Sequence, residues 1–183
     1  EVAAEIEAGL DRAASLTHQL ITMARVESDA YALHPAALDL AELVQDGIAQ
    51  AAPSAVKRRL ELAYNGPASL PAVADAAALQ SVLNNLLENA IKYSTPGGQI
   101  EVSLQTLADA HHLTVRDDGP GIPETCHARL FERFYRVPGV QQAGSGLGLA
   151  IVQNLVVRHG GSIEIIEGLS GRGIGFAVRL PAG

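Results

Sequence analysis

The sequence predicts an α+β domain with one antiparallel or mixed sheet and helices packed on one face of that sheet. Two pairs of strand-like segments, 99–107 with 111–117 and 162–167 with 174–180, are joined by short turns, as in antiparallel hairpins. Between the hairpins lie segments with the period of amphipathic helices. Hairpins in place of strand–helix–strand crossovers favour this class over a parallel α/β sheet.

The N-terminal segment 1–30 predicts one helix of a bundle. Its apolar and small residues step by four and three positions, at Val2, Ile6, Gly9, Ala13, Leu16, Leu20 and Met23. This spacing forms an a/d seam, which implies a partner helix that covers it. The alternative is an amphipathic helix that lies on its own domain. Residues 31–38 contain a proline and lose the seam, so we expect a linker there.

Further helix and strand signals follow the linker in order. Asp39, with a glutamate three positions later, predicts a capping box that opens a helix over 39–52. The alternation in 58–64 predicts a strand. Asp75 predicts the N-cap of a helix over 76–93.

A long segment separates the first hairpin from the next helix, which is predicted over 147–159 and ends before two glycines. Within it only 124–131 predicts a short helix. Long loops in a domain are usually functional or disordered. This one carries an aromatic and basic cluster that could close over an anionic ligand: Phe131, Arg133, Phe134, Tyr135 and Arg136.

Composition narrows the classes of function. The 183-residue chain is 48% hydrophobic, has no tryptophan and carries a formal charge of −7, so we expect no nucleic-acid partner. The single cysteine, Cys126, excludes a disulfide framework and favours a reducing compartment. No run of about 18 apolar residues predicts a membrane span, and no signal peptide is evident.

Three alternate glycines, Gly144, Gly146 and Gly148, precede an apolar helical segment. The pattern is neither a Walker A loop nor a Rossmann fingerprint. Glycines at a helix N-terminus let backbone amides approach a phosphate. The alternative is a flexible glycine loop without a ligand.

Asn85, Asn89 and Lys92 fall on one polar face of the predicted helix 76–93. Amide oxygen suits Mg²⁺, and a lysine there could reach a phosphate as a point charge. The alternative is an ordinary solvated face.

Asp117 ends a predicted strand, and Gly119 and Gly121 follow it. A carboxylate in this place could accept a hydrogen bond from an exocyclic amine, which would select adenine over guanine. The alternative is a plain turn, since aspartate and glycine both favour turns.

The order of these motifs, N-x-x-x-N-x-x-K-Y, D-x-G-x-G, F-E-R-F-Y-R and G-x-G-L-G-L, resembles the catalytic ATP-binding domain of bacterial two-component sensor histidine kinases. That domain belongs to the gyrase/Hsp90/histidine kinase/MutL superfamily. The resemblance implies a two-layer α/β sandwich of the Bergerat type over 39–183, with a lid at about 122–146. It also implies that 1–30 is the second helix of a dimerisation and histidine-phosphotransfer hairpin.

The resemblance also implies roles for individual residues. Asn89 would bind Mg²⁺, Asn85 would support the metal and phosphates, and Lys92 and Arg136 would contact phosphate, the last three being the catalytic set. Asp117 would bind the adenine amino group. The remaining implied nucleotide-binding residues are Tyr93, Gly119, Gly121, Ile122, Phe131, Phe134, Gly144, Gly146, Leu147, Gly148 and Leu149.

Asn85 stands where hydrolytic members of the superfamily carry a glutamate that acts as general base. An amide cannot accept a proton in this way, so transfer to another protein group is favoured over hydrolysis. Glu88 remains an alternative base. Asp118 and Ile174 depart from the common pattern, which has Asn and often Thr at these positions.

No histidine lies in a sequence resembling the family's phosphoacceptor box, H-E-[LF]-R-T-P, and His18 lies off the seam. The expected function is therefore transfer of the γ-phosphoryl group of Mg-ATP to a histidine outside this chain, for relay to a response regulator. The full-length protein would be a homodimer and an inner-membrane sensor, with this part cytosolic and making no direct membrane contact. The alternatives are an ATP hydrolase of the same superfamily and an ATP-gated binding module.

Overall fold

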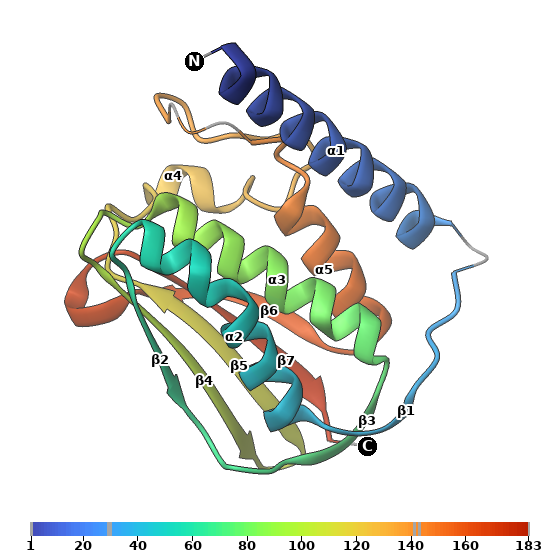
Figure 1. The fold of residues 1–183 in the computed structure, drawn as a ribbon. Helices are drawn as coiled ribbons and strands as arrows, with labels where there is room; N and C mark the ends of the chain where they lie inside the picture. The colour runs from blue at the N-terminus through green and yellow to red at the C-terminus, as the bar shows by residue number, and fades with distance from the viewer. Residues whose placement is uncertain (1, 29–30, 141, 143, 183) are drawn as a thin grey trace.

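The computed structural model describes the backbone of residues 2–28, 31–140, 142 and 144–182 (Figure 1). The side chains of 2–8, 10–12, 15 and 18 lie outside the description. The elements are α1 (Val2–Glu27), β1 (Ala36–Asp39), α2 (Leu40–Lys57), β2 (Glu61–Asn65), β3 (Pro71–Ala74), α3 (Ala76–Tyr93), β4 (Gln99–Leu107), β5 (Ala110–Asp117), α4 (Glu124–His127), α5 (Gly148–Arg158), β6 (Ser162–Glu167), the 3₁₀ turn η1 (Leu169–Gly171) and β7 (Ile174–Pro181).

Five strands form one mixed sheet in the order β2-β4-β5-β7-β6. Both predicted hairpins are present as antiparallel pairs, β4 with β5 and β6 with β7. β2 runs parallel to β4, because α3 crosses between them in the sequence. The predicted fold class, a mixed and mostly antiparallel sheet with helices on one face, is confirmed (Figure 1).

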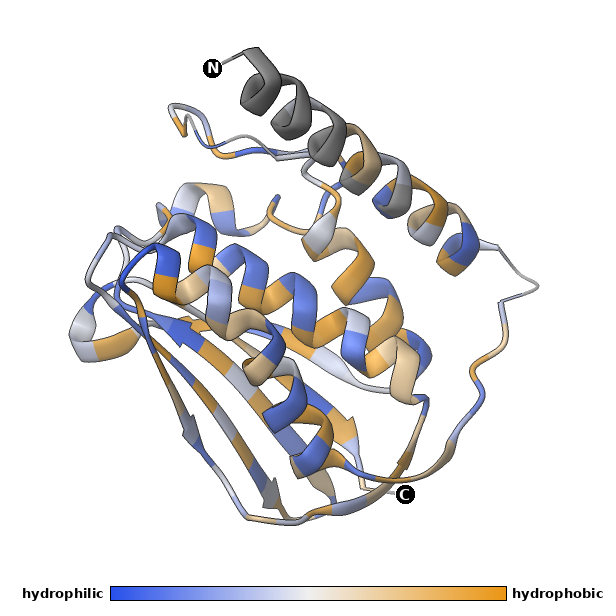
Figure 2. Cartoon of the chain, viewed as in Figure 1, coloured by the Kyte–Doolittle hydropathy of each residue, from blue (hydrophilic) through white to orange (hydrophobic). Residues whose placement is uncertain are grey.

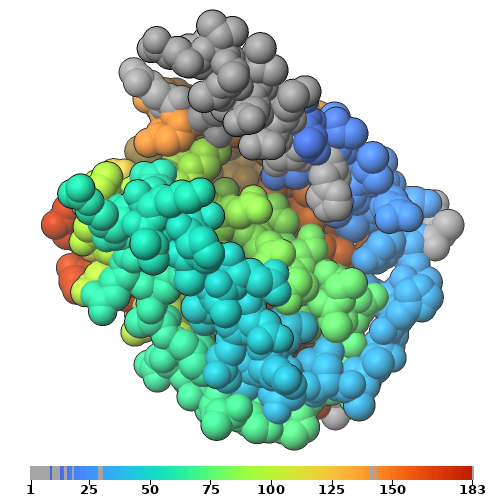
Figure 3. All heavy atoms as spheres, viewed as in Figure 1, coloured from blue at the N-terminus to red at the C-terminus, as the bar shows by residue number. Residues whose placement is uncertain are grey.

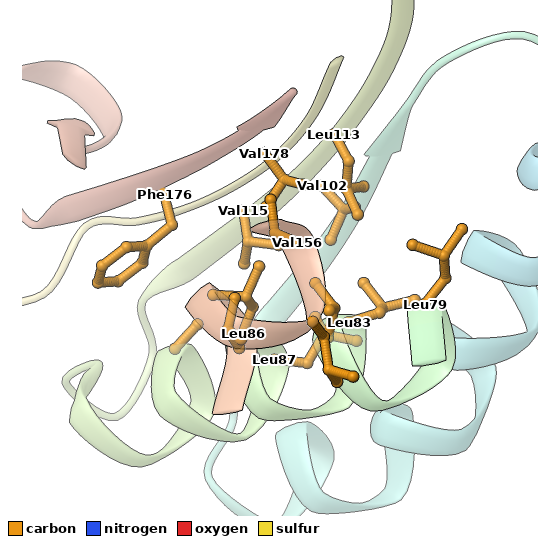
Figure 4. Close-up of a cluster of buried hydrophobic side chains, with 14 of the residues drawn as sticks. Leu79, Leu83, Leu86, Leu87, Val102, Leu113, Val115, Val156, Phe176 and Val178 are labelled. Carbon is orange, nitrogen blue, oxygen red and sulfur yellow. The ribbon is translucent and has the colours of Figure 1, made fainter. Parts of the chain in front are cut away.

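The core lies between the sheet and α3, and apart from Phe176 its central residues are aliphatic. The apolar stripe of α3 faces the inward side chains of β4, β5 and β7, and Val156 of α5 closes the cluster (Figure 4). The residues at the centre of this contact include Leu79, Leu83, Leu86, Leu87, Val102, Leu113, Val115, Phe176 and Val178. Along the strands, hydrophobic residues alternate with polar ones, so one sheet face is apolar (Figure 2). Residues of α2 and α3 lie at the surface on the face of the molecule shown in Figure 3.

Several element boundaries differ from the prediction. The segment 31–38, expected to be a linker, runs into β1, which pairs with β3. Neither of these four-residue strands was predicted. α2 continues past 52 through Pro53 to Lys57, and α4 ends at His127. No helix in the described part of the chain is long and apolar enough to cross a membrane.

α1 lies against α5, and its predicted seam is divided between two environments. Met23 is buried together with Val26, whereas Leu16 and Leu20 are exposed. The last seam position therefore packs on the protein's own domain, which was the alternative considered for this helix. Val2, Ile6 and His18, which carried other predictions for α1, have side chains outside the described residues.

Asp39 joins the start of α2 by hydrogen bonds to the residues that precede β3. Its Oδ1 accepts hydrogen bonds from the N–H groups of Ala41 and Leu70, both at 2.9 Å, and Ser69 donates its hydroxyl to Oδ2. The Ser69 hydroxyl and the Leu70 N–H hold the pKa of Asp39 at about 2, below its usual value of 3.8. The carboxylate therefore stabilises the fold above pH 3.8, and this contribution is lost as the pH falls toward 2.

We expect Asp39→Ala to lower the melting temperature at pH 7 by roughly 2–4 °C, because α2 loses its N-cap. The difference from wild type should shrink as the pH falls below 3.8. Thermal denaturation followed by circular dichroism at several pH values measures both effects. Asp46→Ala, which changes an exposed aspartate on the same helix, is the matched control. Equal shifts for the two variants would contradict this role for Asp39.

Candidate functional site

A cavity of about 620 Å³ lies between α3, the sheet, the segment that joins β5 to α5, and α1. A volume of this size suits a small-molecule ligand. Its walls divide into an apolar part around Asp117 and a polar part formed by α3 and the glycine loop, residues 144–148.

Asp117 ends β5 and is buried, with 5% of its surface exposed. Its Oδ1 accepts hydrogen bonds from the N–H groups of Gly119 at 2.9 Å and Ile174 at 3.3 Å. These bonds orient the carboxylate, and Oδ2 could accept a hydrogen bond from a ligand. Burial raises the pKa of Asp117 above its usual value, against the lowering effect of the two backbone N–H groups. The apolar residues that line this part of the cavity are Leu86, Ala90, Val115, Ile122, Ile174 and Phe176.

The polar part begins with Asn85, Asn89 and Lys92 on α3, which all line the cavity. Asn85 donates its side-chain amide to the Ser81 carbonyl at 2.8 Å, so its Oδ1 is left for other contacts. A methyl group at Gly148 would lie 2.9 Å from this Oδ1. The first turn of α5 therefore approaches α3 as closely as it does because position 148 has no side chain.

The glycine loop is tied to the aromatic segment that precedes it. Gly146 has a φ of +72°, and its carbonyl accepts a hydrogen bond from Phe134 N–H at 2.9 Å. A methyl group at position 146 would lie 2.6 Å from the Phe134 carbonyl carbon. The loop then leads into α5, whose first amides have no partner within the helix.

Lys92 and Arg136 supply positive charge to the cavity. The Lys92 ammonium lies 4.8 Å from the centre of the Tyr93 ring. The Arg136 guanidinium donates to the carbonyls of Val140, at 3.3 Å, and Gln142, at 2.6 Å. Both bonds come from Nη2, so the N–H groups of Nε and Nη1 could still donate to a bound anion.

Most predicted site residues line this cavity: Asn85, Asn89, Lys92, Tyr93, Asp117, Gly121, Ile122, Arg136, Gly144, Gly146, Gly148 and Leu149. Four do not: Gly119, Phe131, Phe134 and Leu147. Gly119 donates its N–H to Asp117 Oδ1, and Leu147 is buried in the core, with only 1% of its surface exposed.

The two phenylalanines have different surroundings. Phe131 packs edge-on against Phe176 at 6.4 Å, whereas Phe134 is 62% exposed and has a φ of +60°. Phe131 therefore supports the cavity wall, and Phe134 faces solvent. Neither ring lines the cavity in this arrangement.

Other residues that line the cavity were not predicted. They include Leu16 and Gln19 of α1, Ser145 of the glycine loop and Phe176 of β7. The alternation of inward-facing residues along β7 is the sequence pattern that could have predicted Phe176. Asp118, which departs from the common pattern of the family, does not line the cavity, and its Oδ1 accepts a hydrogen bond from Gln99 N–H at 2.9 Å.

Residues 74–183 match the model of a known family, described as histidine kinase-, DNA gyrase B-, and HSP90-like ATPase. The chain belongs to this family. Within it, the chain is an ATP-binding domain of the kind found in sensor histidine kinases, as the relatives and solved structures show.

Two relatives are sensor proteins. The chain is 45% identical to the swarming motility regulation sensor protein RssA of Serratia marcescens over 182 residues, which cover 99% of this chain and 39% of RssA. It is 34% identical to the sensor protein kinase PmrB of Pseudomonas aeruginosa, with 97% and 37% covered. The chain thus spans less than half the length of these curated relatives.

Two solved structures share the fold of this ATPase-family domain. Full-length ShkA in complex with AMPPNP matches with a TM-score of 0.85 and 30% identity, over 98% of this chain and 38% of ShkA. The mycobacterial sensor histidine kinase MprB matches with a TM-score of 0.73 and 29% identity, over 80% of this chain and 97% of that one.

Proposed function

We propose that the chain binds Mg-ATP in this cavity and is the catalytic domain of a sensor histidine kinase. The observation that carries the proposal is the pairing, within one cavity, of a buried carboxylate among apolar walls with an amide, lysine and glycine-loop face. An adenine nucleotide has the matching chemistry: a flat base with one amino group at one end and a charged triphosphate at the other. ShkA, a relative of known structure, is described in complex with AMPPNP.

Adenine would lie among the apolar residues and donate its amino group to Asp117 Oδ2. Since Gly119 and Ile174 already bond Oδ1, the carboxylate is oriented before the ligand arrives. A guanine would present a carbonyl oxygen to the same carboxylate, and two acceptors repel each other. The site therefore favours adenine.

The triphosphate would lie along α3 and the glycine loop. Lys92, Arg136 and the first amides of α5 would bind its oxygens. Asn89, supported by Asn85, would hold Mg²⁺ through amide oxygen, and this donor set fits an ion that keeps water and phosphate as its other ligands. When bound, Mg²⁺ would neutralise phosphate charge during transfer.

Phosphoryl transfer to a protein group fits the site better than hydrolysis. Asn85 carries no basic group, and its amide nitrogen is bonded to the Ser81 carbonyl. The acceptor would be a histidine outside this chain, followed by a response regulator, within a dimeric, membrane-anchored sensor whose cytosolic part includes this domain. Hydrolysis is a second candidate because Glu88 also lines the cavity. An ATP-gated binding module is a third.

The experiment that separates these candidates extends the chain at its N-terminus with the preceding residues of its native protein and supplies γ-labelled Mg-ATP. Acid-labile label on a histidine supports the kinase, and free phosphate alone supports the hydrolase. Nucleotide binding without either product supports the binding module. Glu88→Gln should leave labelling of the histidine intact and would abolish phosphate release if Glu88 were a base.

Asp117 also predicts a pH dependence of binding. Because burial raises the pKa of this carboxyl, it takes up a proton at a higher pH than an ordinary aspartate. The carboxylate accepts an adenine amino group more strongly than the neutral acid, so affinity should fall by up to roughly tenfold as the pH drops through this raised pKa. Titration with adenosine measures this effect without the phosphates, which titrate near pH 6. Constant adenosine affinity down to the ordinary aspartate range would contradict it.

A further inference from the structure

Helix α1 touches the glycine loop through one hydrogen bond that the sequence did not predict. Ser145 donates its hydroxyl to Gln19 Oε1 at 2.5 Å, across 126 positions of sequence. Both residues line the nucleotide cavity, and so does Leu16, one turn earlier on α1. The wall of the cavity thus includes a helix outside the ATPase-family match, which begins at residue 74.

Ser145 also holds the backbone at the start of α5. Its Oγ accepts a hydrogen bond from Leu147 N–H at 3.1 Å. Because the hydroxyl proton is directed at Gln19, a lone pair of Oγ is free to accept this N–H. Leu147 immediately precedes α5, where backbone amides would otherwise be available to a phosphate.

Other contacts hold the end of α1 against the lid and against α5. Arg133 in the lid forms an ion pair with Glu27 in the last turn of α1. Arg158 of α5 donates to the carbonyls of Ser28 and Tyr31, at 3.0 and 3.1 Å, just after α1. Arg136, a predicted phosphate ligand, is bonded to lid carbonyls. Arg136 and the Leu147 N–H are therefore both hydrogen-bonded within the protein while α1 holds this position.

We propose that Gln19 is a positioning residue through which α1 competes with the triphosphate for the glycine loop. The inference rests on the proposed function, in which the triphosphate lies along the glycine loop and the first amides of α5. The Gln19–Ser145 bond keeps Leu147 N–H occupied, and triphosphate binding has to break this arrangement. A movement of α1 away from α5 would release the loop, so the position of α1 sets the affinity for ATP.

The test compares Gln19→Ala with wild type in the 183-residue chain. Loss of the Gln19 acceptor should speed hydrogen exchange of amides 144–149 without nucleotide and tighten Mg-ATP binding by roughly two- to tenfold, the effect of one neutral hydrogen bond. Adenosine has no phosphate, so its affinity should not change. Gln45→Ala, which alters an exposed glutamine on α2, is the matched control.

Ser145→Ala removes the same bond from the other side and serves as the second variant. Ser145→Ala also removes the acceptor of the Leu147 N–H, so adding Gln19→Ala to it has no further bond to break. The double variant should therefore bind ATP about as tightly as Ser145→Ala alone. Weaker ATP binding by Gln19→Ala, unchanged loop exchange, or an equal gain for adenosine would overturn the proposal. If wild type binds ATP and Gln19→Ala has the same affinity, only the role of Gln19 fails. If wild type binds no adenine nucleotide, the proposed function fails.

Discussion

Asp117→Asn is expected to weaken ATP binding by roughly 10- to 100-fold. The variant loses a charge-assisted hydrogen bond to the adenine amino group and places an amide N–H donor against that group. The asparagine oxygen can replace Oδ1, which accepts from Gly119 and Ile174. Its amide nitrogen would then occupy the Oδ2 position and face the adenine amino group. Calorimetric titration with a non-hydrolysable ATP analogue measures the change.

The specificity of this loss separates recognition of adenine from damage to the fold. Binding of GTP should not fall, because guanine would present a carbonyl oxygen to the new amide donor. Asp118→Asn is the matched control, because Asp118 bonds Gln99 N–H and does not line the cavity. An equal loss for ATP and GTP, or wild-type affinity in Asp117→Asn, would argue against the proposed placement of the base.

Asn89→Ala is expected to abolish the Mg²⁺-dependent part of ATP binding, a loss of at least roughly tenfold. The side-chain amide is the proposed metal ligand, and the alanine side chain has no oxygen to replace it. ATP titrations in Mg²⁺ and in EDTA measure the effect. The difference between these two conditions should be large in wild type and close to zero in the variant.

Asn84→Ala tests whether any asparagine on α3 would behave in the same way. Asn84 accepts a hydrogen bond from Gln80 at 2.9 Å and does not line the cavity. We expect this variant to keep both its affinity and its Mg²⁺ dependence. If Asn89→Ala also keeps them, the metal does not bind where we propose.

Local signals accounted for the elements that carry the site. α3 begins directly after Asp75, as predicted, because the carboxylate accepts the Ala78 N–H and the apolar stripe then repeats at helical period. β4 has its predicted bounds, since its alternation places one face on the core. Features of this kind are determined by a few consecutive residues and can be predicted from the sequence.

Features that depend on distant partners could not be predicted in this way. β1 and β3 are each four residues long and exist through their pairing with one another, Ala36 opposite Ala74. Phe131 belongs to a conspicuous aromatic cluster, yet its position is decided by Phe176, far along the sequence. Nothing near Gln19 in the sequence indicates that it meets Ser145.

A crystal structure of the chain with Mg²⁺ and a non-hydrolysable ATP analogue tests the central claim most directly. We predict that the adenine amino group lies within hydrogen-bonding distance of Asp117 Oδ2, that Mg²⁺ is bound by Asn89, and that phosphate oxygens contact Lys92 and the first amides of α5. A nucleotide bound outside this cavity, or one whose phosphates lie against Asp117, would contradict the account.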